Sequence, residues 1–251
     1  MSIERQPFSI INDNSLTNFV ICLDLDETLV RTLSILNDEE AALKVAEDLG
    51  IYTNPEYLDI RLRSFRLTLD DPVTPKGTGV QHGCWGITRP HLKEFLVFCF
   101  TYFRKVCIWS AGVENYVHDI AKFISRDLRK FDIIFSRSEC QLVKTDTGDE
   151  YTKPLKYMID KFPQIGPIEL MFVVDDRSAT FMHNPECGIE IPIYKPKPEI
   201  NQLRMDDDNL LRLKYWFLLP HVKECKDVRQ LDKSNIFSKS PAEYMEKIKN
   251  P

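Results

Sequence analysis

The sequence predicts an α/β fold in which a parallel sheet lies between helices on both of its faces. Apolar runs short enough for strands, such as VICL at 20–23 and MFVV at 171–174, alternate with longer amphipathic stretches. Strands of parallel sheets are covered on both faces, so they read as continuous apolar runs. Polar residues follow several of these runs directly, at the strand ends where α/β proteins bind their ligands.

Local patterns predict the individual elements. We expect strands in the run that begins at Val20 and at 105–112, 131–137, 168–176 and 188–193. We expect helices at 89–103, with a proline in its first turn, and at 113–125, 153–162 and 206–222, the last with an acidic first turn. Because helices alternate with strands, each crossover can return the chain in the same direction, and the sheet can stay parallel.

Residues 31–88 interrupt this alternation and are predicted to form a small insertion of one helix and an antiparallel hairpin or three-stranded sheet. The helix is expected at 37–50, with an acidic start and a glycine stop. Alternation of apolar and charged residues predicts a strand at 58–70, and residues 84–90 could pair with it across the turn-rich segment 71–79. The expected domain organisation is therefore a core of residues 1–30 and 89–251 with this insertion.

Composition excludes several classes of function. The chain has 251 residues and a formal net charge of −5, so a broadly basic surface for nucleic acid or anionic membranes is not expected. The start MSIERQPFSI has no signal-peptide core, and no apolar run reaches membrane-spanning length. Seven scattered cysteines without a CxxC pair indicate buried thiols in a reducing compartment. These features predict a nuclear or cytoplasmic protein, and they leave its oligomeric state open.

Polar residues at the ends of the predicted strands should meet at one edge of the sheet. An apolar run that carries two carboxylates is unusual, because a buried carboxylate needs a cation or dense hydrogen bonding. Mg²⁺ would relieve the repulsion in such a cluster, and a lysine and a hydroxyl beside it would complete a phosphate site. The residues concerned are Asp24, Asp26, Ser110, Lys153, Asp175 and Asp176.

Simpler structural roles are open for some of these residues. Ser110 and Thr28 are also common turn or cap residues, and the pair at 175–176 could cap a helix. Lys153 has alternatives elsewhere in the chain, including Lys144. Their positions at strand ends favour the functional interpretation.

At this point a family resemblance is evident. DLDETLV at 24–30 resembles the DxDx(T/V) signature of haloacid dehalogenase (HAD) superfamily phosphatases. The chain is further similar, in order, to the Fcp/Scp-type (NIF-like) branch, which dephosphorylates serine in the carboxy-terminal domain (CTD) of RNA polymerase II. The similar segments are RPHLKEFL, IWSAG, SRSEC, YTKPL and VVDDRSATFMHNP. The resemblance runs from about residue 19 to about residue 231 and implies a HAD-like, Rossmannoid core.

The resemblance implies roles for the residues of the first motif. Asp24 would be the nucleophile that forms an aspartyl-phosphate. Asp26 would protonate the leaving oxygen and later activate water. Thr28 would orient this pair by hydrogen bonding.

It also implies a phosphate site and a metal site. Ser110 and Lys153 would bind the phosphate, and Arg137 is placed like a family arginine that contacts it, although a surface ion pair is an alternative. Mg²⁺ would be bound by Asp24, the backbone carbonyl of Asp26 and Asp176, with Asp175 in support.

Two positions differ from the family pattern. Asp-Asn is frequent where this chain has Asp175-Asp176, and threonine is frequent where it has Ser110. Both differences keep a ligand oxygen or a hydroxyl, so the chemistry should survive.

The implied function is a Mg²⁺-dependent phosphatase that acts on phosphoserine of a protein or peptide, such as the polymerase tail. One alternative is a HAD phosphatase that acts on a small metabolite or on a nucleic-acid 3′-phosphate end. The other is a noncatalytic scaffold, which the intact set of motif carboxylates disfavours.

Overall fold

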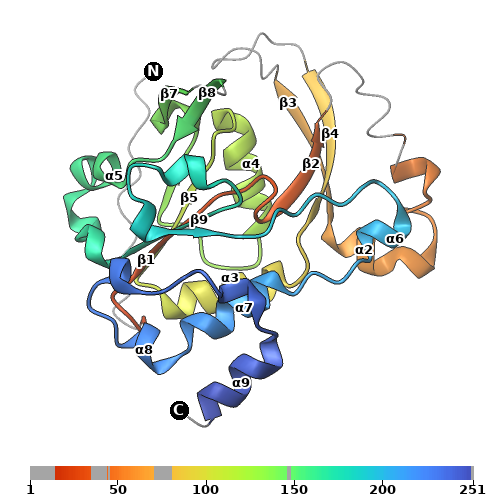
Figure 1. The fold of residues 1–251 in the computed structure, drawn as a ribbon. Helices are drawn as coiled ribbons and strands as arrows, with labels where there is room; N and C mark the ends of the chain where they lie inside the picture. The colour runs from red at the N-terminus through yellow and green to blue at the C-terminus, as the bar shows by residue number, and fades with distance from the viewer. Residues whose placement is uncertain (1–14, 35–43, 45, 71–80, 146–147, 250–251) are drawn as a thin grey trace.

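A five-stranded parallel sheet forms the centre of the protein (Figure 1). The structure is a computed structural model that describes residues 15–34, 44, 46–70, 81–145 and 148–249. The strand order is β10-β9-β1-β5-β6, and every neighbouring pair is parallel. The strands are β1 (Val20–Leu23), β5 (Lys105–Trp109), β6 (Ile133–Phe135), β9 (Met171–Asp175) and β10 (Gly188–Glu190). The predicted α/β fold with its parallel sheet is confirmed.

The register of the sheet aligns the strand ends that carry polar residues. Leu23 of β1 lies level with Ile108 of β5 and Val174 of β9. The chain beyond each of these positions therefore emerges at one edge. This edge is the carboxyl end of the sheet, where α/β proteins place their ligands.

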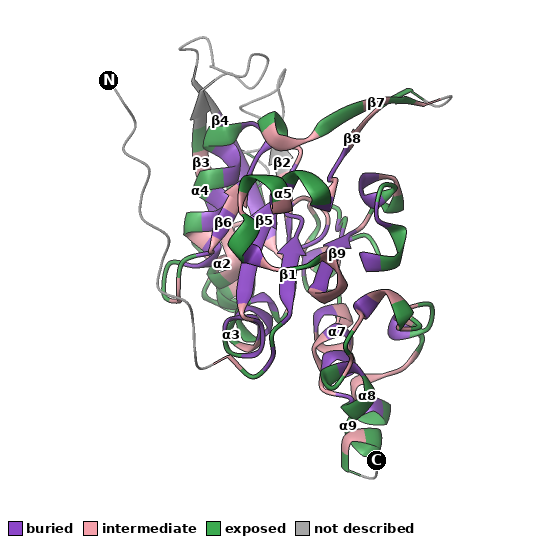
Figure 2. Ribbon diagram, turned by 90° about the vertical axis from the view of Figure 1, so that its left-hand side faces the viewer, coloured by how far each residue is buried: buried purple, intermediate pink, exposed green. Residues whose placement is uncertain are grey.

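Helices flank the sheet, as predicted (Figure 2). The α-helices outside the insertion are α3 (Leu92–Tyr102), α4 (Glu114–Ile124), α5 (Leu155–Lys161), α6 (Ile200–Leu203), α7 (Asn209–Phe217), α8 (Pro220–Lys223) and α9 (Pro241–Lys249). Short 3-10 helices are η1 (Pro55–Tyr57), η2 (Arg137–Glu139), η3 (Pro163–Ile165), η4 (Ile168–Leu170), η5 (Ser178–Phe181), η6 (Pro185–Cys187), η7 (Val228–Gln230) and η8 (Ile236–Ser238). Among the described residues, no helix combines the length and apolarity that a membrane span requires.

Aromatic side chains hold α3 and α7 against the sheet. Phe217 of α7 packs edge-on against Phe172 of β9 at 5.0 Å and against Phe103 at 4.9 Å between ring centroids. Tyr102 is fully buried, and its hydroxyl donates to the Phe217 carbonyl. Such pairs add roughly 0.5–1.5 kcal/mol each to the burial of their apolar area.

A three-stranded antiparallel sheet is formed by residues of the predicted insertion and Val30. Its order is β2-β4-β3, with β2 (Val30–Ser34), β3 (Ser64–Asp70) and β4 (Gln81–Thr88). Gly86 of β4 makes room for a ring, because a Cβ there would lie 2.2 Å from Cζ of Phe65. The segment 71–79, predicted to be a turn, lies outside the described residues.

The prediction of one strand over residues 58–70 is wrong in its first half. Leu58–Arg63 forms helix α2, and only Ser64–Asp70 is a strand. Alternating apolar residues suggested a strand, but only Ile60 is buried, in a small cluster with Trp85 and Ile87. The helix follows a 3-10 turn that Asn54 caps. Tertiary packing of one residue and a local cap therefore outweigh a period-two pattern.

Of the predicted helix at 37–50, the structure describes residues 44 and 46–50, and residues 44 and 46–48 are helical. The amide of Ile51 bonds to the carbonyl of Ala46, and Gly50 has a φ of +67°. This is the glycine stop that the sequence predicts. The remainder of the predicted helix lies outside the described residues.

A projecting hairpin was not predicted from the sequence. It consists of β7 (Gln141–Thr145) and β8 (Gly148–Thr152), and it extends away from the body of the protein (Figure 2). Much of it is exposed, so it lacks the apolar run by which the strands of the central sheet were found.

All seven cysteines are free, as predicted.

Candidate active site

A cavity of about 320 Å³ opens at the carboxyl edge of the central sheet. It is formed by segments that are far apart in the sequence, namely the chain after β1, β5 and β9 and the end of β8. Seven of the eight sequence-predicted residues line it, and Thr28 lies buried directly behind them. The seven are Asp24, Asp26, Ser110, Arg137, Lys153, Asp175 and Asp176.

Asp24 stands at the point where β1 ends. Its amide donates to the Val174 carbonyl at 3.0 Å, which extends the β1–β9 pairing by one residue. The residue is only 8% exposed. Burial raises the pKa of Asp24 well above its ordinary value, although Lys153 opposes this shift.

Lys153 is the cation at the centre of the cavity. Its Nζ donates to Oδ1 of Asp24 at 2.6 Å and to Oδ2 of Asp175 at 2.5 Å. The side chain is fully buried, and burial by itself lowers a lysine pKa. The charges of Asp175 and Asp24 outweigh that effect and raise the pKa of Lys153, so the ammonium form persists. The end of β8 positions this lysine, and its amide bonds to the Thr180 carbonyl at 2.6 Å.

Asp26 has a partner that sequence reasoning missed. The hydroxyl of Tyr116, on α4, donates to Oδ1 of Asp26 at 2.5 Å, and Thr32 of β2 lies 2.7 Å from the same hydroxyl. Burial raises the pKa of Asp26 to about 6, and the hydrogen bond from Tyr116 opposes the shift. The sequence around Tyr116 shows only an amphipathic helix. Nothing in that local pattern indicates a contact with Asp26, which lies 90 residues away in the sequence.

The loop after β5 packs closely against the same helix. Oγ of Ser110 accepts a hydrogen bond from the amide of Gly112 at 3.1 Å. A Cβ on Gly112 would lie 2.8 Å from Cδ1 of Tyr116. Glycine is therefore required here for the close approach of the backbone, and a larger residue would displace the tyrosine that bonds to Asp26.

Thr28 connects the first motif to the end of β9. Its Oγ1 accepts from the Asp176 amide at 3.1 Å and donates to Oδ1 of Asp176 at 3.3 Å. The other carboxylate oxygen of Asp176, Oδ2, is buried and has no hydrogen-bond partner among the residues that the structure describes. Burial, together with the charges of Asp175 and Glu27, raises the pKa of Asp176. An unpaired buried carboxylate oxygen at this position suits a site that binds a cation.

The carboxylates could hold a metal ion. Asp24, Asp175 and Asp176 each offer an oxygen, and these oxygens lie within 4.8 Å of one another. Oxygen ligands and a small number of carboxylates suit Mg²⁺. The residues present thus fit the divalent cation, and the orphaned Oδ2 of Asp176 is the observation that supports the fit.

Arg137 lies at the mouth of the cavity. Its Nε donates to the Ala111 carbonyl at 2.7 Å, and its guanidinium lies over the ring of Tyr151 at 5.3 Å from the centroid. Within the described residues, Arg137 forms no ion pair with an acidic side chain, which was the alternative role. The ring of Tyr151, on the hairpin, and Arg177 also line the mouth.

Arg89 is a buried residue that braces the first motif from behind. The sequence predicts that it lies in the first turn of a helix, but α3 begins only at Leu92. The Arg89 guanidinium donates to the Thr28 carbonyl at 3.0 Å and to the Pro192 carbonyl at 2.6 Å. Both oxygens of Asp207 accept from it at 2.9 Å. Part of the acidic run at 206–208 therefore neutralises Arg89, beyond its predicted role as a helix start.

Comparison with known proteins identifies the family of this chain. The family model for NLI interacting factor-like phosphatases matches residues 19–229. The CTD phosphatase-like protein 355R of Invertebrate iridescent virus 3 is 27% identical over 188 residues, which cover 71% of this chain and 86% of that protein. The ubiquitin-like domain-containing CTD phosphatase 1 of Gallus gallus is 25% identical over 231 residues, covering 88% of this chain and 67% of that one.

Solved structures share the fold. The structure of Fcp1, an essential RNA polymerase II CTD phosphatase, superposes with a TM-score of 0.54 at 18% identity and covers 87% of this chain. A fission yeast Fcp1 variant bound to beryllium fluoride gives a TM-score of 0.53 at 18% identity, again over 87% of this chain. This chain spans only 59% and 60% of those two proteins. The HAD-like fold inferred from the sequence is confirmed.

Proposed function

This chain belongs to the NLI interacting factor-like phosphatase family, and we propose that it is a Mg²⁺-dependent phosphoprotein phosphatase with Asp24 as its nucleophile. The observation that carries the proposal is the contact between Lys153 and Asp24 at 2.6 Å in a buried cluster of carboxylates. A buried carboxylate fixed by a lysine, beside hydroxyl and arginine groups, suits attack on a phosphate group. These groups would neutralise the phosphate oxygens, whose negative charge would otherwise repel the attacking carboxylate.

The reaction has two steps. In the first, a carboxylate oxygen of Asp24 attacks phosphorus, the bond from phosphorus to the substrate oxygen breaks, and Asp26 donates its proton to that leaving oxygen. In the second, Asp26 removes a proton from water, the water oxygen attacks phosphorus, and the bond to Asp24 breaks. Phosphate leaves, and both aspartates return to their starting states. The pKa of Asp26, about 6, suits a group that must both give and take a proton near neutral pH.

The remaining residues would orient the phosphoryl group and neutralise its negative charge. Lys153 and Ser110 would bind the oxygens of the phosphoryl group, and Thr28 would hold the loop of Asp176 in place. Asp24, Asp176 and the Asp26 carbonyl would hold Mg²⁺, with Asp175 in support through its contact with Lys153. When bound, the ion neutralises charge on the transferring phosphoryl group.

The substrate is proposed to be phosphoserine in an extended protein segment, such as the tail of RNA polymerase II. Support comes from the family and from relatives whose names describe CTD phosphatases. The cavity mouth is also suited to a phosphorylated chain, because Arg137 places positive charge there and Tyr151 supplies an apolar face, while Arg177 is paired with Glu150.

The purified protein should be assayed on phosphoserine and phosphotyrosine peptides, sugar phosphates and 3′-phosphate oligonucleotides. We expect the highest kcat/KM for phosphoserine peptides, loss of activity in EDTA and recovery with Mg²⁺. A strong preference for a sugar phosphate or an oligonucleotide end would refute the protein substrate. Activity that is indifferent to chelation would refute the metal site, and no activity on any substrate with Mg²⁺ would favour a scaffold.

A further inference from the structure

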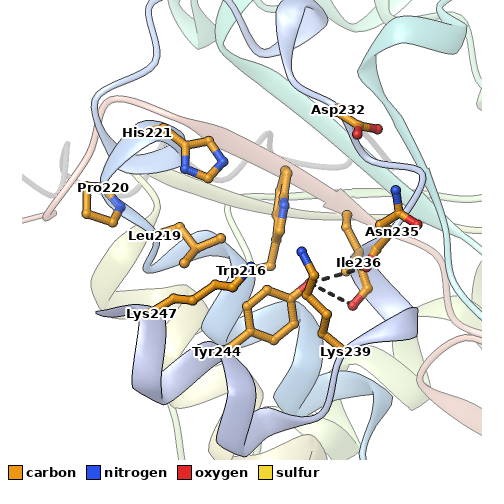
Figure 3. A pocket seen from close by; sticks show the side chains of 10 residues that line it. All are labelled: Trp216, Leu219, Pro220, His221, Asp232, Asn235, Ile236, Lys239, Tyr244 and Lys247. Atoms are coloured by element: carbon orange, nitrogen blue, oxygen red, sulfur yellow. Dashed lines mark hydrogen bonds between the residues drawn. The ribbon is translucent and has the colours of Figure 1, made fainter. Parts of the chain in front are cut away.

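A second cavity, of about 460 Å³, lies among the C-terminal helices (Figure 3). It is formed by α7, α8, the segment around η8 and α9, at the opposite end of the molecule from the β7–β8 hairpin (Figure 2). None of its lining residues takes part in the phosphatase site. Its volume is in the range of small-molecule sites, roughly 300–1,000 Å³.

The inner wall of this cavity is apolar and well fixed. Trp216, Leu219 and Ile236 line it, and each is almost completely buried. Tyr244 closes the wall, with its hydroxyl donating to the Ile236 carbonyl at 2.9 Å. The tyrosine hydroxyl is thus satisfied, whereas Nε1 of Trp216 has no hydrogen-bond acceptor among the described residues. The wall therefore offers a flat apolar surface and one free N–H donor.

Two lysines supply the polar side of the cavity. Lys239, after η8, and Lys247, on α9, extend toward each other over the rings of Trp216 and Tyr244 (Figure 3). Proximity to Lys247, by hydrogen bonding and charge repulsion, lowers the pKa of Lys239. Neither lysine forms an ion pair with any acidic side chain in the described part of the chain. Two ammonium groups therefore lie close together although their charges repel each other.

Two carboxylates lie near the lysines: Asp232 lines the cavity, Glu243 lies on α9, and the charges of both act on Lys239. Asp232 accepts from the amide and the hydroxyl of Ser234, at 2.9 and 2.7 Å. Glu243 accepts from the amide and the hydroxyl of Ser240, at 2.7 and 2.8 Å. These contacts fix each acid at its own turn and leave the two ammonium groups without a direct counterion.

We propose that this cavity binds a small organic oxyanion, whose phosphate or carboxylate head lies between Lys239 and Lys247 and whose flat apolar body rests on Trp216. The head would accept charge-assisted hydrogen bonds from both ammonium groups, and it would relieve their repulsion. The body would cover Trp216 and Leu219, in a volume that a bare inorganic ion leaves mostly empty. This site is separate from the phosphatase cavity and does not depend on the proposed catalytic function.

Phenyl phosphate is a suitable probe, with ¹H–¹⁵N NMR of the tryptophan indoles as the readout and EDTA present to prevent turnover. The Trp216 indole signal is assigned by loss in Trp216→Phe. The Trp109 indole, next to Ser110, reports binding at the other end of the molecule. We expect the Trp216 signal to shift and saturate, and the double variant Lys239→Ala/Lys247→Ala to weaken that binding about tenfold or more.

The matched control is Lys249→Ala, which removes an exposed lysine from the same helix but not from the cavity. It should bind phenyl phosphate as the wild type does. Inorganic phosphate should bind more weakly than phenyl phosphate, because it lacks the ring. The proposal is overturned if only the Trp109 signal moves, if the double variant binds as tightly as wild type, or if inorganic phosphate binds as tightly as phenyl phosphate. Unchanged phosphatase activity and melting temperature in the double variant would show that its fold is intact.

Discussion

The two cavities of this protein carry opposite imbalances of charge. At the carboxyl edge of the sheet, four carboxylates line a cavity whose buried cation, Lys153, contacts two of them, and two arginines lie at its mouth. Among the C-terminal helices, two ammonium groups face each other without a carboxylate in direct contact. The excess of negative charge at the first cavity suits a bound cation, and the excess of positive charge at the second suits a bound anion.

The two sites also differ in how deeply their charges lie. Lys153 is 1% exposed, so water screens its contacts with the carboxylates poorly. Lys239 and Lys247 are near the surface, where screening is strong. Removing a charge should therefore cost much stability at the first site and little at the second. The burial of a charged group therefore indicates how strongly the fold depends on its partners.

The largest expected effect is that of Asp24→Asn on turnover. The amide matches the carboxylate in size but cannot act as the nucleophile, so kcat should fall by a factor on the order of 10⁴ or more while the fold persists. Steady-state assays with a phosphopeptide, together with thermal melting, measure both properties. Substantial residual turnover in a folded variant would exclude Asp24 as the nucleophile.

Asp26→Asn should separate the two chemical steps. The second step always needs a base for water, whereas the first needs an acid only when the leaving group is poor, so turnover should fall roughly 10²–10⁴-fold. With an activated aryl phosphate, acid quench should then trap phosphate on Asp24 after an initial burst. If no covalent phosphate accumulates, Asp26 has a different role.

Lys153→Met tests how much stability is lost when the buried carboxylates lose their cation. The change leaves Asp24 and Asp175 without their cation, and it should lower the free energy of unfolding by about 3–5 kcal/mol in EDTA. Mg²⁺ should restore part of this loss. Urea denaturation measures both values.

The control for Lys153→Met is Lys156→Met, at a lysine whose side chain is 83% exposed and pairs with Asp160. It should cost less than about 1 kcal/mol. Equal losses in the two variants would contradict the view that burial makes the Lys153 contacts important.

Arg137→Ala should weaken substrate binding without affecting the metal. Loss of a direct contact with phosphate should reduce kcat/KM for a phosphoserine peptide by about 1.5–3 kcal/mol of transition-state free energy. Mg²⁺ binding should not change. Arg126→Ala, at an exposed arginine over Phe123, is the control and should be neutral. A loss of activity that equally affects Arg126→Ala would show that Arg137 has no specific role.

The smallest expected effect is that of Lys239→Ala on stability. Because this lysine contacts another cation rather than a carboxylate, its removal should change the free energy of unfolding by less than about 0.5 kcal/mol. Denaturation without added anion measures the change. A loss comparable with that of Lys153→Met would mean that Lys239 has a structural partner, and the comparison between the two cavities would fail.

The sequence by itself determined the class of fold and named the candidate site residues. Both follow from local patterns, since continuous apolar runs identify buried parallel strands and polar residues directly after them identify the ligand edge. Asp24 and Asp175 were found in this way because Asp24 directly follows β1 and Asp175 is the last residue of β9. Arg137 depended on the family resemblance rather than on any local pattern.

Only the tertiary structure decided the contacts between distant segments. The bond from Tyr116 to Asp26, the bracing of Thr28 by Arg89 and the convergence of Lys239 with Lys247 each depend on how whole elements pack. The same is true of residues 58–63, where burial of Ile60 favours a helix over the strand that the alternating pattern predicts. Periodicity records which face of an element is apolar, but it carries no information about which distant side chain that face will meet.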